Sequence, residues 1–70
     1  MDFLILTLLG SKTEYRVNLH HIIEIYPASP NNENAGTVIT MIGGNEQTVS
    51  ETIPKIEVAI RKLGGKLVGA

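Results

Sequence analysis

The 70-residue sequence contains no cysteine, which excludes disulfide bonds and thiolate metal ligands. Its two histidines are too few for a metal cage, and its aromatic content of 4% is thin for a platform on which nucleic-acid bases stack. The formal net charge is −1, so the chain as a whole has no general attraction for nucleic acid or acidic membranes. These absences remove most of the groups with which small domains perform chemistry.

The length of the chain sets the domain count and the source of stability. Seventy residues form one domain, and a chain this short buries only about 60% of the surface that its unfolded form exposes. Without disulfides or a metal, association with other chains is the remaining aid, and an apolar content of 43% favours it. We predict one domain over residues 1–65, a short tail over 66–70, and a homo-oligomer or larger assembly.

The apolar run over residues 3–9 is the only segment that could be confused with a targeting or membrane signal. It lacks a basic region before it and a small-residue cleavage site after it. It is also far shorter than the roughly 20 residues that cross a bilayer. We therefore expect a strand that is buried on both faces or covered by a partner, no membrane span, and a cytoplasmic location or a place in an assembly built there.

Residues 13–26 continue with two further strand patterns. Tyr15 and Val17 alternate with charged residues, which is typical of a half-buried strand that pairs with the first as a hairpin. Asn18 is a good cap for a single helical turn. A third strand follows, in which period-two alternation predicts Ile23 and Ile25 inward and Glu24 and Tyr26 outward.

The middle of the chain predicts a wide loop and a second hairpin. Residues 28–36 have the composition of an exposed loop. The β-branched run over 37–42 predicts a strand with Ile39 and Met41 on one face and Val38 and Ile42 on the other. A tight glycine turn and a short fifth strand over 47–49 come next.

The C-terminal part predicts one amphipathic helix. Thr52 or Ser50 can cap it, and Pro54 falls in the first turn, where its missing N–H costs nothing. Gly64 and Gly65 end it. The apolar stripe that buries one face is formed by Ile53, Ile56, Ile60 and Leu63. The fold class is therefore α+β: a small, curved antiparallel sheet of about five short strands, with an SH3-like barrel as one form of it, and a C-terminal helix.

No motif in the sequence indicates catalysis, a cofactor or a metal. His20 and His21 are adjacent and diverge on a helical turn, whereas metal-binding pairs on helices prefer i, i+4 spacing. The glutamates have no spacing that selects an acid–base pair, and the serines lie in turns or caps. The side chains we nominate instead are partner contacts: Tyr26, Lys55, Arg61, Lys62, Leu67 and Val68.

The order of motifs resembles that of the FlbD-like small flagellar and swarming-motility proteins over residues 3–63. The matching residues are Gly10, Tyr15, Asn18, Ile23, Glu24, Thr37, Val38, Ile39, Thr40, Gly44, Val49 and Glu51, followed by the helix. The loop over 28–36 looks longer than the family's, and Gly36 stands where an acidic residue is expected. The resemblance implies a non-enzymatic motility protein, with Asn18 and Glu51 in structural cap and turn positions.

The sequence therefore predicts a non-enzymatic protein–protein interaction or assembly module, with a motility accessory protein as the role that the resemblance suggests. Two alternatives stay open. One is a small structural subunit of a bacteriophage or other bacterial particle. The other is a nucleic-acid-binding regulator that uses Lys55, Arg61, Lys62 and Lys66. An enzyme or small-ligand binder is a third class, which a pocket with convergent polar groups would favour.

Overall fold

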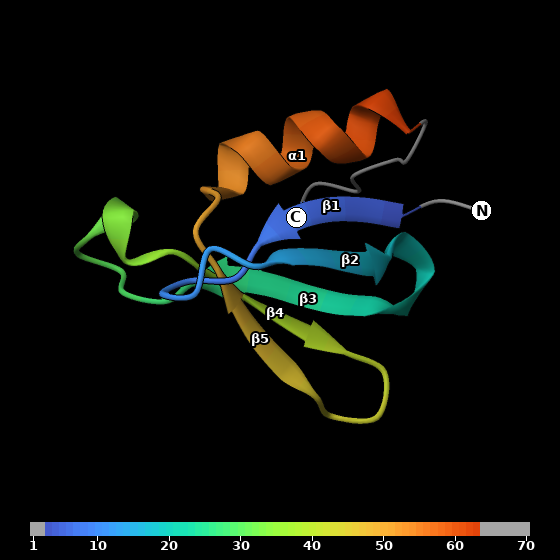
Figure 1. Ribbon diagram of the computed structural model, residues 1–70, viewed down its shortest axis with the longest axis horizontal. Coiled ribbons are helices and arrows are strands. Elements are labelled where there is room, and N and C mark those ends of the chain that lie inside the picture. Colours follow the sequence, from blue (N-terminus) through green and yellow to red (C-terminus); the bar gives the residue numbers. More distant parts are fainter. Residues whose placement is uncertain (1–2, 64–70) are drawn as a thin grey trace.

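A computed structural model describes residues 3–63 and shows an α+β domain with five antiparallel strands and a C-terminal helix (Figure 1). This confirms the fold class expected from the sequence. The elements are β1 (Phe3–Thr7), β2 (Glu14–Asn18), β3 (Ile22–Pro27), β4 (Thr37–Met41), β5 (Glu46–Val49) and α1 (Ile53–Lys62).

The strands form two sheets that meet at one corner. β1 and β2 make a hairpin, and β3, β4 and β5 make an antiparallel meander. An isolated bridge between Leu8 and Val49 joins the end of β1 to β5. The backbone N–H of Leu9 donates to the Thr48 carbonyl at 3.0 Å, and that of Ser50 donates to the Thr7 carbonyl at 2.8 Å.

This topology corrects one expectation from the sequence: the strands that the structure describes do not close into an SH3-like barrel. No ladder joins β2 to β3 among the described strands, so the sheets stay open on that side. The reason is the 3₁₀ turn at Leu19–His21, which redirects the chain between these two strands. Asn18 Oδ1 accepts a hydrogen bond from the N–H of His20 at 2.9 Å, which confirms the predicted cap.

Glu51 fastens the corner where the sheets and the helix meet. Its Oε1 accepts the backbone N–H of Thr7 at 2.9 Å. Its carbonyl accepts the hydroxyl of Thr37, a buried side chain, at 2.7 Å. These two bonds connect β1, β4 and the segment leading into α1, so Glu51 has a structural role at this corner.

One apolar core lies between the sheets and the helix. Its buried members come from β1, β2, β4, β5 and α1, and they are Leu4, Leu6, Val17, Ile39, Val49, Ile56 and Ile60. Leu4 pairs with Val17 across the hairpin. Ile56 and Ile60 are one turn apart on α1, so both reach the core from one helix face.

β1 differs from the expected strand in two respects. It ends at Thr7 rather than at Leu9: Leu8 still donates its N–H to the Thr13 carbonyl at 2.9 Å, but Leu8 and Leu9 also pair with β5. It is buried on one face only: Leu4 and Leu6 lie in the core, whereas the alternate residues Phe3 and Ile5 are exposed. The apolar residues on the outer face of β1 are therefore not required by this core.

β3 contains a β-bulge that the alternation rule missed. The register shifts between Ile22, which pairs with Met41, and Glu24, which pairs with Thr40. The extra residue puts Ile23 and Glu24 both on the exposed side, and Ile23 is 62% exposed. Ile23 was expected to point inward; Ile22 packs against the core in its place, while Ile25 does so as predicted.

The remaining boundaries follow the predicted pattern with small shifts. β3 and β4 pair across the wide loop, which contains a second 3₁₀ turn at Glu33–Ala35. Thr52 is the N-cap of α1, but its side chain makes no capping hydrogen bond. The predicted helix end at Gly64 and Gly65 lies outside the described residues.

The backbone at Gly36 gives a first testable prediction. Gly36 has φ +92° and ψ −172°, a conformation open essentially to glycine alone, and a Cβ there would collide with the Val49 carbonyl oxygen. We expect Gly36→Ala to lower the free energy of unfolding by about 2–4 kcal/mol, measured by urea denaturation. Gly44→Ala is the matched control, because Gly44 also has positive φ (+86°) but has nothing near its Cβ position. Equal losses in the two variants would contradict the argument.

The β-bulge gives a second prediction. Ile39→Ala removes a fully buried side chain and should cost about 2–5 kcal/mol of unfolding free energy. Ile23→Ala removes the same atoms from an exposed position and should cost less than about 0.5 kcal/mol. Chemical denaturation of the two variants side by side checks that Ile23 lies outside the core. A large loss of unfolding free energy in Ile23→Ala would show that Ile23 points inward, as regular alternation predicts.

Candidate functional site

The described residues offer little for metal chemistry. Over residues 3–63, no three His, Cys, Asp or Glu side chains come close enough together to hold a metal ion. His20 and His21 sit on the 3₁₀ turn after β2, where His20 donates its N–H to Asn18. The His21 carbonyl accepts the N–H of Ile42 at 2.8 Å. These backbone contacts of His20 and His21 join the turn to β2 and to the segment after β4.

The same part of the chain contains no helix that is both long and apolar enough to cross a membrane.

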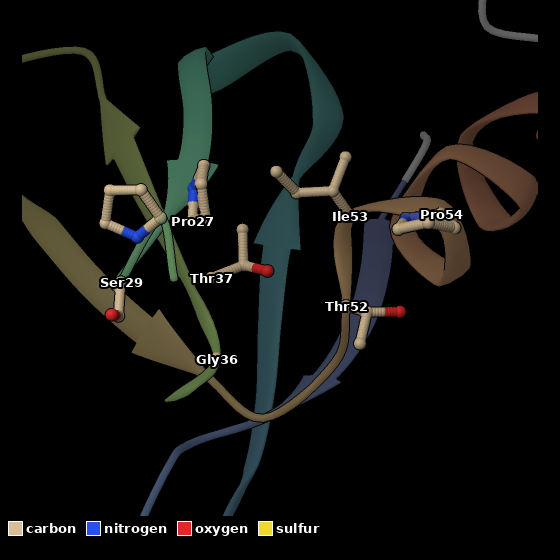
Figure 2. A pocket seen from close by; sticks show the side chains of 8 residues that line it. Pro27, Ser29, Gly36, Thr37, Thr52, Ile53 and Pro54 are labelled. Atoms are coloured by element: carbon tan, nitrogen blue, oxygen red, sulfur yellow. The ribbon is translucent and has the colours of Figure 1, made fainter. Parts of the chain in front are cut away.

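A depression of about 280 Å³ lies between the end of β3, the wide loop and the start of α1 (Figure 2). Three prolines and Ile53 give it largely apolar walls; the full lining is Pro27, Ser29, Pro30, Gly36, Thr37, Thr52, Ile53 and Pro54. Thr37 is its buried polar side chain, and its hydroxyl is already donated to the Glu51 carbonyl. The depression therefore lacks the set of converging polar groups that fixes a substrate.

The outer face of the β3–β4–β5 sheet carries an acidic and aromatic group. Glu24, Thr40 and Glu46 face one another across the three strands. The hydroxyl of Tyr26 donates to Glu46 Oε2 at 2.7 Å, and Thr40 Oγ1 lies 3.5 Å from the same oxygen. The hydrogen bond to Glu46 is the largest cause that raises the pKa of Tyr26, and the charges of Glu46 and Glu24 raise it further.

Two exposed isoleucines extend this face beyond the acidic group. Ile23, at the bulge, and Ile42, at the start of the glycine turn, are 62% and 61% exposed. Ile42 directly follows β4 and donates its N–H to the His21 carbonyl at 2.8 Å, so the two isoleucines belong to adjacent segments of the chain. We call the residues Ile23, Glu24, Tyr26, Thr40, Ile42 and Glu46 the sheet patch.

The outer side of α1 carries the predicted cations. With Ile56 and Ile60 in the core, the 100° step of the helix puts Val58 at the centre of the opposite side. Lys55 and Lys62 flank Val58 on one side and Arg61 on the other. All four are exposed, Val58 by 49%, and Arg61 lies 3.9 Å from Glu57 in a loose i, i+4 pair. We call Lys55, Val58, Arg61 and Lys62 the helix patch.

The outer face of the β1–β2 hairpin is a third candidate surface. Phe3 and Ile5 project from β1, and Ile5 lies opposite Arg16 of β2. Arg16 Nε is 2.8 Å from Glu14 Oε2 in a well-exposed ion pair. We call Phe3 and Ile5 the β1 stripe.

The structure separates the nominated contact residues instead of gathering them. Tyr26 belongs to the sheet patch and is partly exposed, whereas Lys55, Arg61 and Lys62 share the helix patch. Leu67 and Val68, together with Lys66, lie outside the described residues. Sequence reasoning missed Ile23, because a bulge breaks the alternation, and it missed Ile42 and Val58. The signal for Val58 was present, since it falls outside the apolar stripe of the helix.

Comparison with known proteins adds no relative: no family model, no curated protein and no solved structure matches the chain.

The Tyr26–Glu46 contact gives a third prediction. Glu46→Gln removes the carboxylate that accepts the phenol hydrogen bond, so the raised pKa of Tyr26 should fall back toward its ordinary value of 10.0. Ultraviolet titration of the phenolate measures it, with Tyr26→Phe to assign the signal and Tyr15, whose pKa burial raises, as the internal reference. An unchanged Tyr26 titration would contradict the hydrogen bond.

The same shift gives the sign of a pH effect on stability. A phenol whose pKa is higher in the folded than in the unfolded state stabilises the fold below the unfolded value, and this contribution is lost as the pH rises through the folded value. The wild-type protein should therefore lose more stability above pH 10 than Glu46→Gln does, as measured by denaturation across that range.

Proposed function

We propose that this protein is a non-enzymatic module that binds other proteins and contributes to an assembly. The observation that carries the proposal is the β1 stripe. Leu4 and Leu6 satisfy the core, yet the alternate positions of the same strand hold Phe3 and Ile5, the latter 60% exposed. A strand with one solvated face normally alternates apolar and polar residues. Apolar residues on the solvated face therefore suit a surface that a partner covers.

The surroundings of the β1 stripe support the same reading. The Glu14–Arg16 ion pair borders Ile5 on the neighbouring strand, which gives an apolar centre with a charged rim. Protein interfaces have this arrangement, in which the rim contributes specificity and the centre contributes most of the free energy of binding. The resemblance to FlbD-like proteins suggests that the assembly concerns motility; a subunit of a bacteriophage or other particle is the competing role.

The helix patch favours one further candidate function. Lys55, Arg61 and Lys62 are exposed on one helix, and a regulator that contacts nucleic-acid phosphates would use such a group. Three cations with one partly engaged by Glu57 make a small electrostatic footprint. Protein binding is the better supported function, because exposed apolar side chains occur on β1, at the β3 bulge and on α1.

The fourth prediction tests the β1 stripe. Ile5→Glu replaces the exposed apolar side chain and places a carboxylate opposite Arg16, a pairing that the hairpin tolerates. Affinity capture of the tagged full chain from its source cells, quantified by mass spectrometry, should show partners depleted at least about tenfold for this variant. Ser11→Glu is the matched control, since it adds the same charge at an exposed turn residue and should retain the partners.

Partner capture that is unchanged by Ile5→Glu would contradict the proposed surface. Partners that disappear on nuclease treatment would favour the nucleic-acid function instead. A deletion strain complemented with wild type or Ile5→Glu distinguishes the roles: swimming or swarming restored by the wild-type chain alone supports the motility role, and normal motility in the deletion strain contradicts it.

A further inference from the structure

The charges of this chain are segregated between two surfaces. No Lys or Arg occurs between Arg16 and Lys55, so β3, β4 and β5 contain none. Their outer face presents Glu24 and Glu46. α1 carries three cations and one carboxylate. The sheet patch is therefore acidic and the helix patch is basic.

Each patch also has exposed apolar side chains among its charges. Ile23 and Ile42 adjoin the carboxylates of the sheet patch, and Val58 lies among the cations of the helix patch. Apolar surface surrounded by charge of one sign is suited to a partner surface that repeats the pattern with the opposite sign. The two patches of this chain are such a pair.

The spacing of the charges agrees as well. Lys55 and Lys62 are two turns apart on the same side of α1, which separates them by about 10 Å along the helix axis. Glu24 and Glu46 lie in one row with Thr40 between them, so two interstrand spacings, also about 10 Å, separate their backbones. A helix laid along this row would bring each lysine to one carboxylate and Val58 over Thr40.

The two patches belong to elements on opposite sides of the molecule. Figure 1 shows α1 at one end of the view and the β4–β5 hairpin at the other, with β1, β2 and β3 between them. One copy therefore cannot bring its own helix patch onto its own sheet patch. Each copy can instead give its helix patch to one neighbour and accept another neighbour's helix on its sheet patch.

We propose that a second copy of this chain binds the sheet patch through its helix patch, in a head-to-tail contact that joins copies into a ring or an open filament. This contact rests on the proposed assembly function and names one of its partners. It uses different surfaces from the β1 stripe, which stays available for another protein. A head-to-tail contact closes into a ring when its rotation permits and otherwise propagates.

The first experiment measures self-association by light scattering over a range of protein and salt concentrations. Wild type should form species larger than a dimer, and association should weaken as salt is raised, because exposed charges are screened. Lys62→Glu should weaken association at least about tenfold. Lys12→Glu, the same charge change at an exposed residue outside both patches, should leave it unchanged. Circular dichroism confirms that both variants are folded.

The second experiment tests the register of the contact. Because the chain has no cysteine, a thiol introduced at one site reacts without background. Oxidation of an equal mixture of Val58→Cys and Thr40→Cys should give mixed disulfide dimers at least about fivefold in excess over either homodimer, as expected when Cβ atoms are brought within disulfide range. Ser11→Cys mixed with Val58→Cys is the control and should give no such excess.

A monomer at all concentrations, or equal effects of Lys62→Glu and Lys12→Glu, would overturn the head-to-tail contact. So would a statistical mixture of disulfides. Salt-dependent binding of a fluorescent double-stranded DNA that is lost in Lys62→Glu, without self-association, would assign the helix patch to nucleic acid instead. The proposed function is tested separately, by the loss of partner capture in Ile5→Glu. Failure of the head-to-tail contact can therefore be distinguished from failure of the proposed function.

Discussion

The corner at Glu51 is the constraint on which the rest of the structure depends. Its carboxylate accepts the Thr7 N–H and its carbonyl accepts the Thr37 hydroxyl, at the point where β1 leaves β2 and pairs with β5. Thr37 is buried, and an unpaired polar group there would be costly, so these bonds help to fix how the two sheets meet. The sheets in turn form the space that Ile56 and Ile60 fill, which places α1 and therefore the side of it that remains exposed.

The exposed surfaces follow directly from that packing. Burying Leu4 and Leu6 turns Phe3 and Ile5 outward, and burying Ile56 and Ile60 turns Val58 outward among the lysines. The bulge in β3 adds Ile23 to a sheet face that also carries carboxylates. A domain of this size has a small core, and its apolar surplus therefore lies on surfaces that other chains can cover. We propose that these surfaces are where the protein binds its partners.

Much of the fold could be predicted because it depends on local rules. Alternation identified the inward faces of β2 and β4, and Asn18 identified the 3₁₀ turn after β2. The helix followed from the spacing of its isoleucines and from Pro54. Local rules failed where the pairing depends on a distant segment. The sequence predicts Leu8 and Leu9 as a continuation of β1, but both also pair with β5. The bulge at Ile23 is set by the register of β3 against Met41 and Thr40.

The sequence by itself determined the α+β class, the order of the elements, the absence of thiol chemistry and the uneven distribution of lysine and arginine, because all of these are properties of composition and short-range periodicity. Only the tertiary structure decided that the barrel stays open and that Tyr26 engages Glu46. It alone placed Glu24 and Glu46 in one row. These features depend on strand register and on contacts between residues far apart in the chain, which no local pattern encodes.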